Sequence, residues 1–402
     1  MEQTQNDTPR GNRLHIGFFG QRNAGKSSLV NAITGQKISI VSEMQGTTTD
    51  PVEKAMELLP IGAVVIIDTP GMDYTGILGQ LRMECTMQIL NHTDIAILVI
   101  NATIGQTAED TELLEQFRKR HISYLIVWNQ IDRLPKEQVV PKEVIPVSAT
   151  TGCGIDKLKE SLIRCYQKNF QIKPERSLFG NLLKPEDLVI LVTPIDESAP
   201  KGRIILPQVQ AIRAALDKAA ICLVTQPEQL AQTLQLLNQP PKLVVTDSQV
   251  FETVKEIIPS SIPLTSFSIL FAHFKGVLQM AKKTVQVLDT LPNGSRILIS
   301  EGCTHHRQCN DIGTIKLPKW IQSYTGKQFQ FDFTSGNSFP NNLTPYALVV
   351  HCGGCMLNER EMISRAERAK TQCVPYTNYG VLIAYLNGIF QRSLSVLEII
   401  DK

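Results

Sequence analysis

A glycine-rich segment at residues 20–27, GQRNAGKS, constrains the fold of this chain more than any other feature. It matches the pattern G-x-x-x-x-G-K-[ST], which requires a strand before it and a helix after it. The apolar run 14–19 precedes the segment, and a helical pattern at 27–35 follows it. The sequence therefore predicts a strand–loop–helix unit whose backbone N–H groups and helix dipole hold phosphate oxygens.

Two side chains of this segment are expected to meet the phosphates or their metal ion. Lys26 would reach the β- and γ-phosphates, and the Ser27 hydroxyl would ligate Mg²⁺. The predicted nucleotide-binding residues here are Gly20, Asn23, Ala24, Gly25, Lys26, Ser27 and Ser28.

The region from residue 14 to about residue 171 alternates apolar strand-like runs with helical patterns. The runs lie at residues 14–19, 63–68, 94–100, 122–129 and 144–149. This alternation is typical of βαβ units. The N-terminal fold is therefore predicted as α/β, a mainly parallel sheet with flanking helices.

Three further short motifs at strand ends indicate which nucleotide is bound. Asp68 and Gly71 belong to the sequence DTPG, where the acid can hold Mg²⁺ and the glycine N–H can meet the γ-phosphate. Asn129 and Asp132 follow a later strand, and Ser148 with Ala149 follows the last one. A carboxylate such as that of Asp132 can accept from the paired N–H donors of guanine, which adenine lacks. The order of these motifs therefore favours GTP.

With these residues the N-terminal region resembles the GTPases of the branch that contains the tRNA-modification GTPase TrmE and the ribosome-assembly GTPase Era. The resemblance implies that GTTTD at 46–50 is a switch motif, with Thr48 a ligand of Mg²⁺ and the γ-phosphate. It also implies that Asn23 helps to bind an activating K⁺; a turn-stabilising role is the alternative. The expected catalytic residues are Lys26, Asn23, Thr48 and Gly71, and the expected magnesium ligands are Ser27, Thr48 and Asp68.

Two positions depart from the wider GTPase pattern. Gln130 stands where the guanine motif usually has lysine, which removes a cation and leaves the guanine selectivity open. Met72 stands where many signalling GTPases have a water-orienting glutamine, and a thioether cannot orient water. Catalytic assistance is therefore expected from elsewhere.

The remaining chain is predicted to hold two more α/β domains. A polar, proline-containing stretch at 167–187 is interpreted as a linker. The predicted domains are 1–172, a P-loop GTPase domain; 173–263, a small α/β domain; and 264–402, an α/β domain with a metal site. No internal repeat is evident from the sequence.

Two cysteine- and histidine-containing loops follow strand-like runs in the third region. Cys303 and His305 follow the run 296–300, and His351, Cys352 and Cys355 follow the run 347–350. Soft thiolate and imidazole ligands select zinc or iron–sulfur centres. A Cys₃His zinc site and a 4Fe-4S cluster with three cysteines and a replaceable fourth ligand both remain open.

The residues after Cys355 predict the start of a helix. Asn358 fits the N-cap and Glu361 fits the acidic third position of that helix. The positive end of a helix is expected to favour the thiolate form of Cys355.

The P-loop domain, the middle domain and the cysteine loops together resemble one family, the FeFe-hydrogenase maturation GTPases called HydF. The resemblance extends to Pro194-Ile195-Asp196 and to the sequences APKGR at 199–203, LTSFSILF at 264–271 and DIG at 311–313. It implies that the first domain binds GTP, the middle one forms a homodimer, and the third holds a 4Fe-4S cluster on Cys303, Cys352 and Cys355. His305 and His351 would be candidate fourth ligands.

The same resemblance implies a function and a set of partners. Members of the family carry a two-iron precursor, made with the radical-SAM enzymes HydE and HydG, and deliver it to apo FeFe-hydrogenase. The alternative is a ribosome- or tRNA-associated regulatory GTPase with a structural zinc site. The C-terminal region lacks the basic stripe with interleaved aromatic residues that RNA binding usually shows.

Charge and hydropathy limit the remaining possibilities. Lys and Arg number 40 against 38 Asp and Glu, so the formal net charge of +2 gives no overall field that attracts nucleic acid. No uncharged apolar stretch approaches the roughly 20 residues of a bilayer span, and the polar start has no signal-like core. The nine cysteines of the 402 residues are odd in number and scattered, unlike a secreted disulfide framework. We therefore expect a cytoplasmic protein that binds no membrane and no nucleic acid.

Overall fold

The computed structural model describes residues 8–35, 51–71, 76–135, 140–171, 177–195, 204–303, 311–336 and 338–399. The chain divides into two compact units, Met1–Glu175 and Arg176–Lys402. No helix within the described ranges combines the length and the apolar character needed to cross a membrane.

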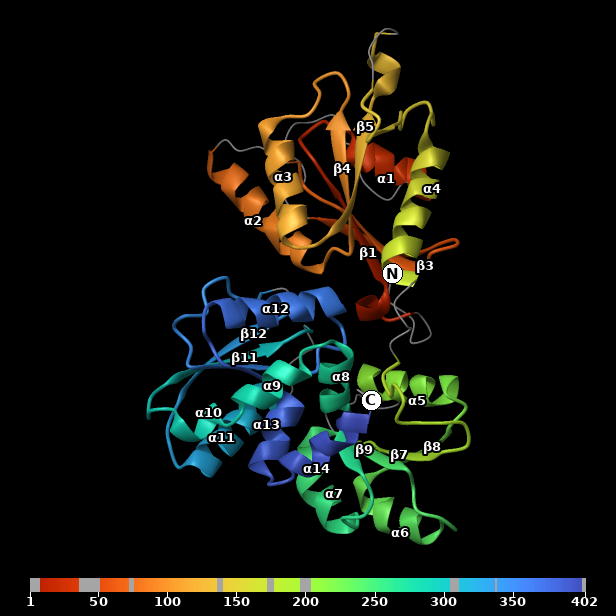
Figure 1. The fold of residues 1–402 in the computed structure, drawn as a ribbon. Helices are drawn as coiled ribbons and strands as arrows, with labels where there is room; N and C mark the ends of the chain where they lie inside the picture. Colours follow the sequence, from red (N-terminus) through yellow and green to blue (C-terminus); the bar gives the residue numbers. More distant parts are fainter. Residues whose placement is uncertain are drawn as a thin grey trace. The chain divides into compact units, whose positions relative to one another are not determined.

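The first unit is built on a six-stranded sheet with the order β2-β3-β1-β4-β5-β6 (Figure 1). All neighbouring strands run parallel except β2, which pairs antiparallel with β3. The predicted α/β class and parallel sheet are confirmed. The edge strand β2 was not predicted, because its sequence VEKAMEL is only half-buried and carries charges. The strands are β1 (Leu14–Phe19), β2 (Val52–Leu58), β3 (Gly62–Asp68), β4 (Ile95–Asn101), β5 (Ser123–Asn129) and β6 (Ile145–Pro146).

Helices cover both faces of this sheet with separate apolar layers. Buried residues of α1 (Lys26–Thr34) and α4 (Ile155–Tyr166) pack with one set of strand side chains. Residues of α2 (Gly76–His92) and α3 (Ala108–Lys119) pack with the other set. Short turns of helix lie at η1 (Arg10–Asn12), η2 (Ile131–Arg133) and η3 (Gln167–Gln171). The predicted nucleotide-binding motifs follow the carboxyl ends of β1, β3, β5 and β6.

The second unit contains two four-stranded sheets, and every pair of neighbouring strands in them is parallel. The first has the order β10-β9-β7-β8, and the second has the order β12-β11-β13-β14 (Figure 1). One continuous apolar core joins them. The strands are β7 (Leu188–Val192), β8 (Ile221–Thr225), β9 (Leu243–Thr246), β10 (Leu264–Ser266), β11 (Arg296–Glu301), β12 (Gln330–Ser335), β13 (Leu348–His351) and β14 (Tyr376–Asn378).

The helices of the second unit follow the same alternation. In the second sheet, α12 lies on one face, and α9, α11 and α13 lie on the other (Figure 1). The helices are α5 (Leu206–Asp217), α6 (Leu230–Gln235), α7 (Phe251–Ile257), α8 (Phe267–Phe274), α9 (Leu278–Thr284), α10 (Val287–Thr290), α11 (Leu317–Thr325), α12 (Glu359–Thr371), α13 (Tyr379–Leu386) and α14 (Phe390–Ser395). Shorter turns are η4 (Pro227–Gln229), η5 (Ser248–Val250), η6 (Ile312–Lys316) and η7 (Val396–Ile399).

Two observations bear on the predicted domain boundaries. Residues 177–183 lie in the stretch interpreted as a linker, yet four of their apolar side chains are buried in the core of the second unit: Leu178, Phe179, Leu182 and Leu183. Strand β10 begins after the predicted boundary at 263/264, yet it pairs with β9 and completes the first of the two sheets. The boundaries at 172/173 and 263/264 stay predictions.

The two halves of the second unit have the same topology. If the strands of each sheet are numbered along the chain, both orders read 2-1-3-4. Their closing segments also match in sequence: PLTSFSILFAHFKG at 263–276 corresponds to PYTNYGVLIAYLNG at 375–388. The backbone agrees, because Val277 N donates to Ala272 O and Ile389 N donates to Ala384 O, each over 2.9–3.0 Å. No internal repeat was evident in the sequence analysis, and the strand order now shows one.

Candidate nucleotide site and cysteine site

Lys26 lies at the start of α1 and is held by the loop that precedes it. Its Nζ donates to Gly20 O and to Gln21 O, each over 2.9 Å. Its side chain is buried, with 6% exposed. The P-loop carbonyls thus fix the ammonium group at the mouth of the loop, where the motif predicts a phosphate contact.

Ser27 and Asp68 form a ready-made pair of oxygen ligands. The Ser27 hydroxyl donates to Asp68 Oδ2 over 2.6 Å, which joins α1 to the end of β3. The second oxygen, Asp68 Oδ1, is buried and has no hydrogen-bond partner among the described residues. A buried carboxylate oxygen without a donor suits a hard cation, so the side chains fit the predicted Mg²⁺.

Gly71 and Gly20 lie where a side chain would collide with the backbone. A Cβ on Gly71 would approach Arg22 Cα to 2.7 Å, so the DTPG turn lies directly against the P-loop. Gly20 has φ +139°, and a Cβ there would lie 2.1 Å from Val99 O. Both glycines are thus needed for close backbone approach, as the predicted phosphate contacts require.

Asn129 ties three of the predicted motifs together. Its Nδ2 donates to Ala24 O over 3.0 Å, and its Oδ1 accepts from Ala149 N over 3.0 Å. The side chain is almost fully buried, with 2% exposed. Ser148 is also buried, and its hydroxyl accepts from Thr151 N over 3.1 Å. The structure thus places the loops predicted to bind the base next to the P-loop.

Gln130 contacts the P-loop through its side-chain amide. Its Nε2 donates to Asn23 O over 2.9 Å, and its Oε1 accepts from Arg133 Nη1 over 3.1 Å. Asn23 and Gln130 both have left-handed backbones, with φ 61° and 68°. Asp132 is exposed at the same end of the sheet, and Ser28 is half-buried on α1. Arg133 thus places a positive charge beside Gln130, where the guanine motif usually has lysine. The sequence analysis did not identify this feature.

Several predicted residues of both sites lie outside the described residues. These are Thr48 with the rest of 46–50 and His305; Met72, which follows the DTPG turn, also lies outside the described residues. Asp196 and residues 199–203, which contribute to the family resemblance, also lie outside them.

The cysteine loops after β11 and β13 meet through Cys352. Its sulfur accepts from Gly302 N over 3.1 Å and from Gly354 N over 3.4 Å. Cys303 follows Gly302 directly and is half-buried, as are Cys352 and Cys355. Two backbone N–H donors aimed at one sulfur suit a thiolate ligand. Within the described residues, no three His, Cys, Asp or Glu side chains are already arranged to hold a metal ion.

Asn358 caps α12, as predicted: its Oδ1 accepts from Glu361 N over 3.0 Å. The expected thiolate form of Cys355 is opposed by burial. Burial, with the neighbouring Cys352 as a second cause, raises the pKa of Cys355 to about 12. Burial also raises the pKa of Cys352, against the opposing effect of its N–H donors. Metal binding would therefore have to displace these protons.

His351, one of the two candidate fourth ligands, is fully buried, with 0% exposed. Its Nδ1 lies 2.9 Å from Cys352 O, and its Nε2 lies 3.1 Å from Nη1 of Arg365. Burial, followed by the charge of Arg365, lowers the pKa of His351 to about 3. Both ring nitrogens are thus engaged within the protein, and the imidazole is neutral at ordinary pH.

Comparison with known protein families identifies the second unit. Residues 178–276 match the hydrogen maturase F dimerization domain, and residues 279–396 match the hydrogen maturase F tetramerization domain. The chain belongs to the hydrogen maturase F family. The resemblance to this family seen in the sequence is thereby confirmed, as is the three-domain α/β architecture. Assembly through the C-terminal region, which the tetramerization domain indicates, was not predicted.

The first unit of this family member is a P-loop GTPase domain. Residues 15–130 match the family described as 50S ribosome-binding GTPase. The chain is 34% identical to the tRNA modification GTPase MnmE of Laribacter hongkongensis over 37% of its own length and 34% of that protein. It is 28% identical to the GTPase Era of Aquifex aeolicus over 40% of its own length and 59% of that protein. The match thus spans about a third to three fifths of these relatives.

Among solved structures, the chain is similar to Era of Aquifex aeolicus in its Y63A form bound to GDP and AlF4⁻. The sequence identity is 21% and the TM-score is 0.35, with 60% of this chain and 97% of that chain covered.

Proposed function

We propose that this chain is a GTP-hydrolysing scaffold that binds a 4Fe-4S cluster. It would also assemble and deliver the two-iron precursor of FeFe-hydrogenase to the apoenzyme. The observation that carries the proposal is the union, in one chain, of a P-loop GTPase domain with both hydrogen maturase F domains. HydE, HydG and apo FeFe-hydrogenase are the proposed partners, a homodimer is the proposed minimal assembly, and the cytoplasm is the proposed location.

The nucleotide site supports GTP hydrolysis with Mg²⁺. Lys26 would hold the β- and γ-phosphates, Ser27 and Asp68 would hold Mg²⁺, and Gly71 N–H would meet the γ-phosphate. Thr48 is proposed as the remaining Mg²⁺ and γ-phosphate ligand. The guanine would lie against Asn129, Asp132, Ser148 and Ala149.

We further propose that K⁺ activates hydrolysis at Asn23. The exposed Asn23 side chain lies on the left-handed turn of the P-loop, and its backbone carbonyl is held by Gln130. A monovalent cation there would supply positive charge to the transition state. GTP turnover should be measured in K⁺ and in Na⁺ at equal ionic strength. Equal rates would remove this part of the proposal.

The cysteine loops support an iron–sulfur cluster on Cys303, Cys352 and Cys355. The Cys352 sulfur, with its two backbone donors, fits a thiolate ligand, and Gly302 brings the Cys303 loop beside it. When bound, a cluster with three cysteine ligands would supply one exchangeable iron position for a second metal group. His305 remains a candidate for that position. His351 would first have to give up its contact with Arg365.

The deciding experiment is anaerobic iron–sulfur reconstitution of the full chain, with metal analysis, absorption spectroscopy and EPR after reduction. About four irons per chain and a reducible S = 1/2 signal are expected. The second candidate function is a ribosome- or tRNA-associated GTPase with structural zinc, which the match of residues 15–130 to a 50S ribosome-binding GTPase favours. One tightly bound zinc and no iron chromophore would support that alternative.

A further inference from the structure

Three side chains form a buried polar cluster directly behind the Cys352 loop. His351 lies at the end of β13, and Glu361 and Arg365 lie one turn apart on α12. Arg365 is 1% exposed, and its Nε donates to Glu361 Oε1 over 2.7 Å. Its Nη2 donates to Gly336 O over 2.7 Å, and the guanidinium lies 5.0 Å from the centre of the Phe339 ring. We call His351, Glu361 and Arg365 the α12 cluster.

The contact between Arg365 and His351 fixes the tautomer of the imidazole. A guanidinium has only donors, so Nη1 must donate and His351 Nε2 must accept. The neutral ring then carries its proton on Nδ1, which lies 2.9 Å from Cys352 O and donates to it. The guanidinium is thus linked through the imidazole to the backbone of the residue that begins the Cys352–Cys355 turn.

The first half of the second unit provides an internal comparison. Cys352 N donates to Ser300 O, and Asp247 N donates to Val192 O, so Asp247 is the counterpart of Cys352. The counterpart of His351 is then Thr246. The corresponding helix α7, with the sequence FETVKEI, has no arginine or histidine. Since both halves build the same 2-1-3-4 sheet, the α12 cluster is not required by the topology; it accompanies the cysteines.

We propose that Arg365 is a positioning residue for the cysteine site: it holds His351 as the Nδ1–H tautomer, which anchors the Cys352 carbonyl and keeps Nε2 off the iron. This inference rests on the proposed function, because the group that Cys352 would bind is the cluster. Hydrogen-bonded residues behind metal ligands hold those ligands in the binding geometry. The fourth cluster position is then left to a group other than His351.

The metal-free chain tests the tautomer without any cluster. The full chain is labelled with ¹⁵N at its histidines, and ¹⁵N NMR should show His351 as a neutral ring protonated on Nδ1. The signal that is missing in the His351→Asn variant is assigned to His351. Arg365→Met should shift that signal toward a mixture of tautomers, and Arg365→Lys should retain the Nδ1–H form. Arg368→Met is the matched control, because Arg368 also lies on α12 and over Phe339 but donates to Phe339 O and Pro340 O. A signal that Arg365→Met leaves unchanged would overturn the proposal.

The reconstituted chain tests the effect on the cluster. Iron loss to a chelator should be about 10-fold faster in Arg365→Met than in the parent or in Arg368→Met, with Arg365→Lys between them. In pulsed EPR, the reduced parent and the reduced His351→Asn variant should show the same ¹⁴N couplings, with no strong coupling from the His351 ring. Such a coupling would identify His351 as an iron ligand and refute the assignment.

The two measurements separate this inference from the proposed function. If no variant and no parent chain takes up iron, the proposed function fails while the tautomer result still decides the role of Arg365. Circular dichroism checks folding, and if Arg365→Met does not fold, Arg365→Lys and the parent spectrum carry the test.

Discussion

At the residue scale, side chains at both candidate sites are held by hydrogen bonds within the protein itself. Lys26 binds the carbonyls of its own loop, and Asn129 bridges the P-loop to the loop after β6. His351 is likewise held between Cys352 and Arg365. Such contacts would preorganise a site, because side chains that are already ordered lose less conformational freedom when a ligand binds.

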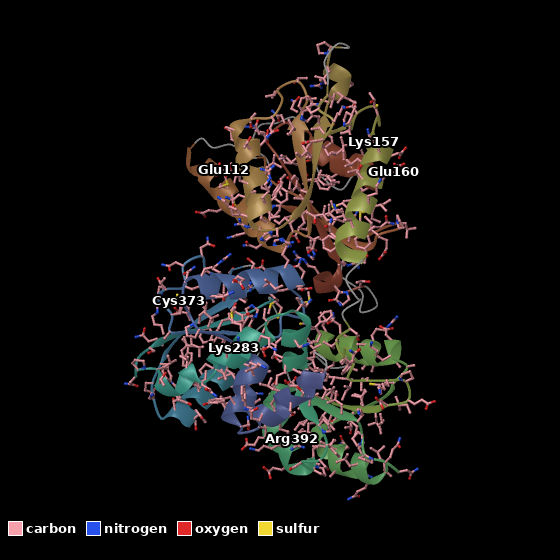
Figure 2. The ribbon with its side chains drawn as sticks, viewed as in Figure 1. Glu112, Lys157, Glu160, Lys283, Cys373 and Arg392 are labelled. Carbon is pink, nitrogen blue, oxygen red and sulfur yellow. The ribbon has the colours of Figure 1, made fainter. Side chains whose placement is uncertain are left out.

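Replacing Lys26 by Ala should lower kcat for GTP at least about 100-fold, because a preorganised positive charge is removed from the transition state. Cluster content after reconstitution should stay unchanged, since the cysteines lie in the other unit. The matched control is Lys157→Ala, an exposed lysine on α4 (Figure 2). Steady-state GTP turnover and iron analysis give both readouts, and loss of iron in Lys26→Ala would contradict independent sites.

The pKa of His351 predicts a pH dependence of stability for the metal-free chain. Its folded pKa of about 3 lies below the ordinary value of 6.5. Below about pH 6.5 the unfolded chain therefore takes up a proton that the folded chain refuses until about pH 3. Above about pH 6.5 this group does not change the free energy of unfolding. Between about pH 6.5 and pH 3 it lowers the free energy of unfolding by up to about 1.4 kcal/mol per pH unit as the pH decreases. Urea unfolding at about pH 7 and pH 5 should show a smaller loss in His351→Asn than in the parent; equal losses would contradict the assignment.

At the element scale, the two repeats are joined where α8 and α13 begin. Gly380 N, at the start of α13, donates to Ser268 Oγ, at the start of α8, over 3.2 Å. Ser268 and Gly380 occupy equivalent positions of the two repeats. Arg392 on α14 (Figure 2) adds a second link by donating to the carbonyls of Ile258, Pro259 and Ile262. The repeats therefore form one unit through equivalent helices rather than through a shared sheet.

Replacing Gly380 by Ala should destabilise the second unit by roughly 1–3 kcal/mol, the usual cost of overpacking. The added Cβ would lie 2.8 Å from Ser266 Oγ and 2.9 Å from Ile269 N, where the backbone cannot give way easily. Lys283→Ala on α9, an exposed site labelled in Figure 2, should change the free energy of unfolding by less than about 0.5 kcal/mol. Denaturant unfolding compares the two, and equal values would argue against this close approach.

At the scale of the whole molecule, the second unit contains an edge strand that suits self-association. Strand β8 lies at the end of its sheet, in the region that matches the dimerization domain. Two of its apolar residues are exposed, Ile221 at 55% and Val224 at 41%. An exposed apolar edge strand is a ready surface for pairing with another chain.

Replacing Val224 by Lys should shift the full chain toward smaller species, because a charge on an edge strand opposes pairing. Sedimentation velocity over a range of concentrations measures the change. Lys242→Met, an exposed lysine that precedes β9, serves as the control. An unchanged distribution in Val224→Lys would place the association surface elsewhere.

Local sequence patterns were sufficient to predict the class of fold and the residue types of the candidate nucleotide site. The P-loop pattern, the DTPG turn and the strands around them are local in sequence, so they could be assigned without knowing any distant contact. The cysteine loops could be recognised for the same reason. Residue types alone do not reveal the hydrogen-bond and packing partners of each side chain.

Those partners depend on how the helices and strands pack. Arg365 lies 14 residues from His351 and looks like an ordinary surface residue of an amphipathic helix, until the β13–α12 packing buries both. Burial raises the pKa of the Cys355 thiol to about 12, which no motif indicates. The repeat was recognised from strand order, because a common backbone path tolerates many apolar exchanges in the core. The local sequence pattern thus indicates which reactive side chains are present. The long-range packing sets which partner each side chain contacts and the direction in which its pKa is shifted.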